Sequence, residues 1–248
     1  MKKYLIIPIV TFVILIFVFG IYAGATKTFP YNTLKYLKSE LDPTSINTKA
    51  SIIAKFDAKS LISINEETDV YQKRQELIQY IWKTDQLPQN IPTDITAKIN
   101  DQRFANLDNL KEIHKISVEM KNDITSVVYL FEPNKTNNKL IIYHQGHGGD
   151  FSKGKDTIQF FLEKDYSVLA FSMPLLGMND QPVVEISNMG KIKLTSHEHL
   201  RFLESSNFSP IKFFVEPITI SLNYLDKNYN FSSYDMVGIS GGGWTVTL

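Results

Sequence analysis

Five residues near the C-terminal end constrain the fold of this chain more than any other feature. They read Gly238-Ile239-Ser240-Gly241-Gly242 and directly follow an apolar segment that ends at Val237. A serine at the centre of this pattern is typical of a sharp turn from a strand into a helix, which lifts the hydroxyl above the sheet in a strained backbone conformation. The turn brings the positions two before and two after the serine close together, so both need glycine. We predict that Ser240 is a nucleophile, and the alternative is an ordinary glycine-rich turn.

A second glycine-rich segment, residues 144–149 with the sequence His-Gln-Gly-His-Gly-Gly, follows the apolar run Leu140–Tyr143. An acyl-transfer site needs two N–H donors aimed at a carbonyl oxygen as it becomes anionic. We assign these donors to the backbone amides of Gly241 and His147. A plain tight turn and a metal site on His144 and His147 are the alternatives, and the metal site lacks a third ligand at a recognised spacing. Four glycines are predicted to let the backbone approach closely at this site: Gly146, Gly148, Gly238 and Gly242.

The spacing of apolar residues after residue 106 predicts alternating strands and helices. Leu140–Tyr143 and Ser167–Ser172 are continuous apolar runs, which are typical of strands buried on both faces. Because parallel neighbours need crossover connections, this alternation predicts an α/β fold with a mostly parallel sheet and flanking helices. The first two strands are joined too tightly for a crossover and should be antiparallel. The remaining predicted elements are strands at 113–120 and 124–131, helices at 155–164 and 216–226 (the latter opened by Pro217), and an irregular insertion at about 173–212.

The first 25 residues differ in character from the rest. Lys2 and Lys3 precede the apolar run Leu5–Tyr22, and a helix extended to Ala25 would cover roughly 31 Å, about the thickness of the hydrocarbon layer of a membrane. This favours a retained membrane anchor. A signal peptide cleaved after the small residues that end at position 25, or a buried core helix, are the alternatives. The two lysines should stay in the cytoplasm, which predicts an extracytoplasmic domain that is membrane-anchored or, after cleavage, secreted.

Residues 26–105 are predicted to form a stalk and a helical extension, with a helix at 66–84, and residues 106–248 are predicted to form the core. With 43% apolar residues and 12% aromatic residues, the composition is that of a folded protein. Lys+Arg and Asp+Glu each number 26, so the chain has no net charge with which to attract a nucleic acid. The absence of cysteine excludes disulfides and thiolate chemistry.

From about residue 110 to the end, the chain resembles the first five strands of an α/β-hydrolase. The resemblance is carried by the Ser240 turn, the loop at 144–149 and the stretch Met-Pro-Leu-Leu-Gly at 173–177. The last two are similar to the esterase and dienelactone-hydrolase-like branch. The resemblance implies that Ser240 attacks a small-molecule carboxylic ester and forms an acyl-enzyme without a metal or other cofactor. A catalytically inactive, membrane-anchored binding protein with this fold, or a peptidase or thioesterase, are the alternatives.

In this fold a catalytic acid and then a histidine follow the nucleophile. Only eight residues follow Ser240, and none of them is acidic or a histidine. We therefore expect this chain to be the N-terminal portion of a hydrolase, inactive as it stands. The segment His197-Glu198-His199 lies in the insertion and has three possible interpretations: solvated polar residues, part of an active-site entrance, or a metal site.

The two lysines give a test of membrane topology. Protease added from the extracytoplasmic side of intact cells should digest residues 26–248, because these cross the membrane while Lys2 and Lys3 stay behind. Mass spectrometry of the mature N-terminus separates an anchor from a cleaved signal, since cleavage leaves Thr26 first. Protection of peptides that contain Ser240 until the cells are lysed would contradict the predicted topology.

Overall fold

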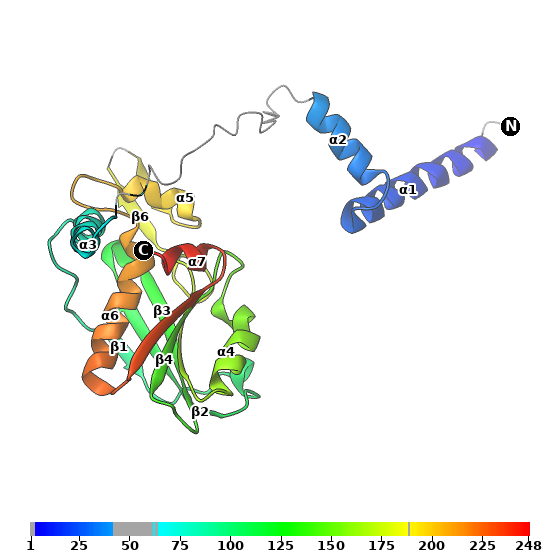
Figure 1. Cartoon of the computed structure of the whole chain (residues 1–248). Coiled ribbons are helices and arrows are strands. Elements are labelled where there is room, and N and C mark those ends of the chain that lie inside the picture. The colour runs from blue at the N-terminus through cyan, green and yellow to red at the C-terminus, as the bar shows by residue number, and fades with distance from the viewer. Residues whose placement is uncertain (1–2, 42–61, 63, 188) are drawn as a thin grey trace. The chain divides into compact units, whose positions relative to one another are not determined.

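The computed structural model describes residues 3–41, 62, 64–187 and 189–248. The chain divides into two compact units, Met1–Ser63 and Ile64–Leu248. The described residues of the first unit form α1 (Lys3–Thr26) and α2 (Tyr31–Leu41) (Figure 1). No single helix among the described residues has both the length and the apolar composition of a membrane span, whereas Val10–Thr26 and Tyr31–Lys38, bent by 80°, meet these limits as a pair. The membrane or signal helix stays a prediction, and residues 42–61 of the predicted stalk lie outside the described residues.

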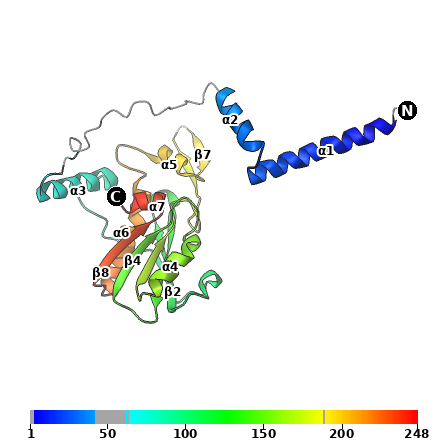
Figure 2. The same ribbon diagram turned by 45° about the vertical axis from the view of Figure 1, so that its right-hand side comes forward.

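The second unit is built on a six-stranded sheet in the order β1-β2-β3-β5-β4-β8. Its strands are β1 (Asp94–Thr96), β2 (Leu110–Glu119), β3 (Thr125–Pro133), β4 (Lys139–His144), β5 (Ser167–Phe171) and β8 (Ser233–Gly238). The antiparallel pairing predicted for β2 and β3 is confirmed. The sheet is mixed rather than mostly parallel, because β3 also runs against β5 and β1 runs against β2. The parallel pairs of this sheet are β4 with β5 and β4 with β8, and Figure 2 shows β8 beside β4.

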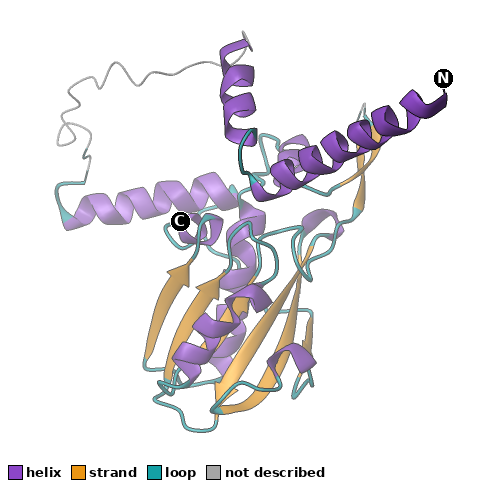
Figure 3. Ribbon diagram, turned by 90° about the vertical axis from the view of Figure 1, so that its right-hand side faces the viewer, coloured by secondary structure: helices purple, strands orange, loops and turns teal. Residues whose placement is uncertain are grey.

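Helices connect the parallel strands, as crossover connections require. α4 (Lys155–Leu162) lies between β4 and β5 in the chain, and α6 (Lys212–Asn228) precedes β8. The two helices cover opposite faces of the sheet (Figure 1), and Figure 3 looks onto the face that α4 covers. Short 3-10 turns occur at Gln102–Phe104, Lys121–Asp123, Phe151–Gly154 and Arg201–Leu203.

Two apolar clusters, one on each face of the sheet, form the core. Tyr129 and Phe131 of β3 belong to the same cluster as Leu162 of α4. Leu130, which lies between them in sequence, belongs to the cluster that contains Leu225 of α6. Because successive residues of a strand point to opposite faces, a strand covered on both sides must be apolar throughout, which is the pattern that the sequence shows.

The predicted helix at 66–84 is present as α3 (Glu67–Trp82). The carboxylate of Asp69 accepts a hydrogen bond from the Glu66 amide at 3.1 Å and so satisfies a donor at the start of the helix. After α3, Asn223 of α6 donates to the carbonyls of Pro88 and Asn90 at 2.8 and 2.9 Å. The helical extension from residue 64 therefore lies in the same compact unit as the sheet.

The insertion at 173–212 is more ordered than the sequence analysis expects. It contains a hairpin of β6 (Val183–Ile186) and β7 (Gly190–Lys193), followed by the short helix α5 (His197–Leu200). Each strand of the hairpin has four residues. Elements of this length are too short for apolar periodicity to identify them.

The start of α6 also corrects the sequence prediction. The helix begins at Lys212, so Pro217 lies inside it rather than in its first turn. Proline has no amide hydrogen, so the carbonyl of Phe213 loses its helical donor. The helix extends to Lys212 nonetheless because Phe213 and Val215 are buried, and tertiary packing outweighs this local cost.

Asn179 fastens the insertion to the sheet, and its replacement should destabilise the protein. Its Oδ1 accepts from the Val127 amide at 2.8 Å, its Nδ2 donates to the Met173 carbonyl at 2.8 Å, and the residue is 6% exposed. A buried polar group left without a partner costs about 1–3 kcal/mol. Asn179→Ala should therefore lower the free energy of unfolding by at least about 2 kcal/mol, measured by chemical denaturation.

Asn207→Ala is the matched control, because Asn207 is an exposed asparagine of the same insertion. It should change the free energy of unfolding by less than about 0.5 kcal/mol. Equal effects of the two substitutions would show that the Asn179 hydrogen bonds do not hold the insertion in place.

Candidate active site

Ser240 lies between the end of β8 and the first residue of α7 (Gly241–Thr245), which is the sharp strand-to-helix turn expected from the sequence. Its backbone has φ 54° and ψ −120°, a conformation that residues other than glycine rarely adopt and that stores strain. Two hydrogen bonds hold the turn. The Gly242 amide donates to the Ile239 carbonyl at 2.9 Å, and the Trp244 amide donates to the Ser240 carbonyl at 3.2 Å.

Backbone crowding explains the glycines that flank this turn. A Cβ atom on Gly238 would collide with the Gly242 carbonyl, and a Cβ atom on Gly242 would collide with the His144 carbonyl. The same His144 carbonyl accepts a hydrogen bond from the Ile239 amide at 3.1 Å. The end of β4 and the turn after β8 are therefore in direct backbone contact, and positions 238 and 242 exclude any residue larger than glycine.

The glycine-rich loop after β4 passes directly beside Ser240. A Cβ atom on Gly146 would collide with the Ile239 carbonyl and would lie 2.8 Å from the Cβ of Ser240. A Cβ atom on Gly148 would meet only the flexible side-chain amide of Gln145, at 3.3 Å. The close approach that the sequence analysis expects of both loop glycines is thus a steric requirement at Gly146 and not at Gly148.

The backbone amides of Gly241 and His147 are the expected donors for an anionic oxygen. Gly241 is the first residue of α7 and so has no acceptor within the helix. In the part of the chain that the structure describes, neither amide donates a hydrogen bond to another group of the protein. Both are therefore available to a ligand, and their role stays a prediction.

The imidazole of His147 lies against Gly241 and reaches a second histidine. A Cβ atom on Gly241 would be 2.5 Å from ring atoms Cε1 and Nδ1 of His147. The Nε2 atom of His147 is 3.1 Å from Nδ1 of His197, whose Nε2 is 2.7 Å from the Pro174 carbonyl. A carbonyl can only accept, so Nε2 of His197 carries a hydrogen, and the neutral ring accepts from Nε2 of His147. The Nδ1 atom of His147 lies beside Gly241.

His197 contacts the glycine-rich loop through His147, and its role at an active-site entrance stays a prediction. Burial lowers its pKa; the hydrogen bond to Pro174 opposes this shift and the charge of His147 adds to it. His147 lines a hollow of about 320 Å³ together with Leu176 and residues 195–198, which include His197. His199 does not line this hollow, because its Nδ1 accepts from the Thr195 amide at 3.2 Å.

His144, the other histidine of the loop, is a buried structural residue. It is 1% exposed, stacks on Phe171 with ring centroids 6.0 Å apart, and donates from Nδ1 to the Gln145 carbonyl at 2.9 Å. Burial lowers its pKa to about 4, so the ring is neutral at pH 7. Among the described residues, no group of three possible metal ligands includes His144 or His147.

The structure brings together two groups of side chains that no sequence motif predicts. His197 reaches His147 across 50 residues of sequence, and no local pattern signals this contact. Glu112, His114 and Glu132 lie together on β2 and β3. A signal for the second grouping does exist, because Glu112 and His114 have the spacing that places two residues on one face of a strand.

The strand order of the sheet brings the Ser240 turn and the glycine-rich loop together. Ser240 follows β8, the glycine-rich loop follows β4, and the two strands are parallel neighbours, so both segments lie at the carboxyl ends of the strands. This is the strand, turn and helix context that a nucleophile at this position requires. The fold is of the α/β-hydrolase type.

No known family model matches the sequence, and no curated protein matches it. Similar solved structures include acetyl xylan esterase 1 from Thermoanaerobacterium sp., which is 14% identical with a TM-score of 0.45, over 73% of this chain and 52% of that one. The glucuronoyl esterase from Solibacter usitatus is 12% identical with a TM-score of 0.41, over 73% and 55%. An esterase from Pyrococcus furiosus is 15% identical with a TM-score of 0.39, over 63% and 50%. The chain spans about half the length of these structures.

His144 makes the stability of the protein depend on pH. Its pKa is about 4 in the folded state and 6.5 when unperturbed, so the unfolded state binds more protons between these values. The free energy of unfolding should be highest above about pH 6.5 and should fall as the pH drops towards 4. His144→Asn keeps a donor for the Gln145 carbonyl but does not titrate. Over this pH range its free energy of unfolding, measured by urea denaturation, should fall by up to about 3 kcal/mol less than that of the unsubstituted protein.

His199→Asn is the control for this measurement, because His199 is a half-buried histidine outside the sheet. It should keep the pH dependence of the unsubstituted protein. Identical pH curves for His144→Asn and the unsubstituted protein would contradict a buried, neutral His144.

Proposed function

We propose that the protein is a serine esterase that hydrolyses carboxylic esters of small molecules through an acyl-enzyme on Ser240. The observation that carries this proposal is the strained Ser240 turn with Gly146 packed directly against it. The amides of Gly241 and His147 support the proposal, because neither donates to an acceptor among the described residues and acyl transfer needs two such donors.

In the proposed reaction, Oγ of Ser240 attacks the carbonyl carbon of the ester while a base removes the hydroxyl proton. The carbonyl oxygen becomes an anion and accepts hydrogen bonds from the amides of Gly241 and His147. The tetrahedral intermediate then collapses, and the alcohol leaves with a proton. Water attacks the acyl-serine in the same way and releases the carboxylic acid, so these steps need no cofactor.

The proposed reaction needs a base, which in this fold is a histidine. Among the described residues, no hydrogen bond joins Ser240 to a histidine. This observation favours a second candidate, a protein that keeps the fold and binds a ligand without catalysis.

A covalent serine probe of the fluorophosphonate class decides between the two candidates. The protein should be isolated as its own cell makes it and treated with the probe. We expect one adduct on the peptide that contains Ser240, no adduct in Ser240→Ala, and an unchanged adduct in Ser206→Ala, because Ser206 is an exposed serine of the insertion. A folded protein that forms no adduct would reject the catalytic proposal and leave the binding protein.

The same protein allows the oxyanion donors to be tested. Gly146→Val should displace the loop from Ser240 and depress kcat by about 10²–10³, the usual loss of one oxyanion donor. His147→Ala keeps its backbone amide, so we expect a loss of less than about tenfold. A severe loss of kcat in His147→Ala would instead assign the catalytic role to the imidazole. A panel of oxyester, thioester and peptide substrates identifies the acyl group transferred.

We further propose that α1 holds the protein at a membrane, with residues 26–248 on the extracytoplasmic side. Large apolar side chains of this helix are exposed; Phe12 is 64% and Phe17 is 69% accessible. Exposed apolar surface of this extent is typical of a segment that contacts lipid or another protein.

A further inference from the structure

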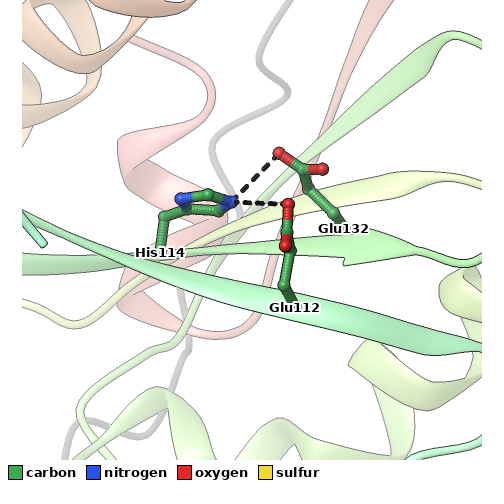
Figure 4. Close-up of side chains that lie close together, drawn as sticks. All are labelled: Glu112, His114 and Glu132. Carbon is green, nitrogen blue, oxygen red and sulfur yellow. Dashed lines mark ion pairs between the residues drawn. The ribbon is translucent and has the colours of Figure 1, made fainter. Parts of the chain in front are cut away.

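A cluster of two carboxylates and a histidine lies at the opposite end of the strands from Ser240. Glu112 and His114 occupy one face of β2, and Glu132 of β3 is the register partner of Glu112 (Figure 4). Glu132 follows Phe131, which pairs with the beginning of β5, whereas Ser240 follows the carboxyl end of β8. The cluster is therefore separate from the proposed active site.

The pairing of two glutamates creates an electrostatic cost that needs a positive partner. Like charges directly opposite each other on antiparallel strands are destabilising. The side chains of Glu112 and Glu132 are only 14% and 16% exposed, so water screens this repulsion weakly.

His114 points into the space between these carboxylates. Its side chain is 10% exposed, and Nε2 lies 3.2 Å from Oε1 of Glu132 and 3.4 Å from Oε1 of Glu112. Figure 4 shows both contacts, but neither has hydrogen-bond geometry, and among the described residues this buried nitrogen has no hydrogen-bond partner. Ligand atoms on one tetrahedral zinc ion, each about 2.1 Å from the metal, lie about 3.4 Å apart.

The other groups that face the cluster are two lysines and a tyrosine. Lys111 Nζ lies 3.1 Å from Glu112 and 3.4 Å from Glu132, and Lys98 Nζ lies 3.3 Å from Glu112. The lysine side chains are 51% and 73% exposed, so these ion pairs are weak and exchangeable. The Tyr229 hydroxyl donates to Oε1 of Glu132 at 2.8 Å and fixes the orientation of that carboxylate, as outer-shell partners of metal ligands do.

We propose that Glu112, His114 and Glu132 bind one divalent transition-metal ion, with zinc as the best match. One imidazole and two carboxylates suit zinc, whereas calcium and magnesium prefer all-oxygen sites with more ligands. A hollow of about 240 Å³, bordered by Lys111, Glu132 and Tyr229, gives room for entry and for a water molecule as fourth ligand. The ion would join β2 to β3 and has no part in the chemistry at Ser240.

Isothermal titration calorimetry tests this site. The full chain in detergent is first freed of metal with a chelator and then titrated with zinc chloride. We expect one zinc ion per chain, and binding at least tenfold weaker in His114→Gln and in Glu132→Gln. His197→Gln is the matched control, because His197 and His147 are the other close histidine pair, and it should bind zinc as the unsubstituted protein does. Loss of binding in His197→Gln with retention in His114→Gln, or no saturable binding at all, would overturn the proposal.

Lys111→Gln separates a metal site from a plain network of ion pairs. If Lys111 competes with the metal for the carboxylates, its removal should tighten zinc binding several-fold and enlarge the rise in Tm that zinc causes. If the cluster is only an ion-pair network, Lys111→Gln should lower Tm and leave zinc without effect, which rejects the proposal. Glu132→Gln keeps an acceptor for Tyr229 and carries the test if His114→Gln does not fold, with circular dichroism as the check of folding.

Discussion

The candidate active site depends on one backbone contact, the close approach of the end of β4 to the turn after β8. The His144 carbonyl accepts the Ile239 amide and leaves no room for a side chain at Gly242. Parallel pairing of β4 with β8 sets His144 opposite Gly238, so both following loops lie at one edge of the sheet. Gly146 then lets the loop after β4 lie against Ser240. The serine can lie this close to the loop only because Gly146 and Gly242 have no side chains.

Ionisable groups have different environments at the two ends of the strands. At the carboxyl ends of the strands, burial keeps His144 and His197 neutral, so they orient neighbouring groups through directed hydrogen bonds. At the opposite edge, charged groups are concentrated, and the pKa of Glu132 is lowered to about 2, mainly by its contact with His114. The difference follows from the partners: carbonyls face the first two histidines, whereas a carboxylate faces the third.

The sequence predicts most of the fold and the position of the Ser240 turn, because the signals involved act within a few residues. Glycines at fixed offsets mark a turn in which a Cβ atom would collide, and the structure has that collision at Gly238 and Gly242. Continuous apolar runs identify β4 and β5, whose residues are buried on both faces. A short turn predicts the antiparallel pair β2–β3, since it leaves no length for a crossover.

Local sequence patterns are therefore sufficient to identify the strand segments, the turn residues and the serine that they present. Contacts between distant groups, such as His147 with His197 or Glu112 with Glu132, are visible only in the folded protein. The same is true of the continuation of α6 through Pro217 and of the crowding at Gly146 rather than Gly148. These outcomes depend on strand register and on burial between segments far apart in the chain, and such long-range packing outweighs local preference without leaving a local pattern.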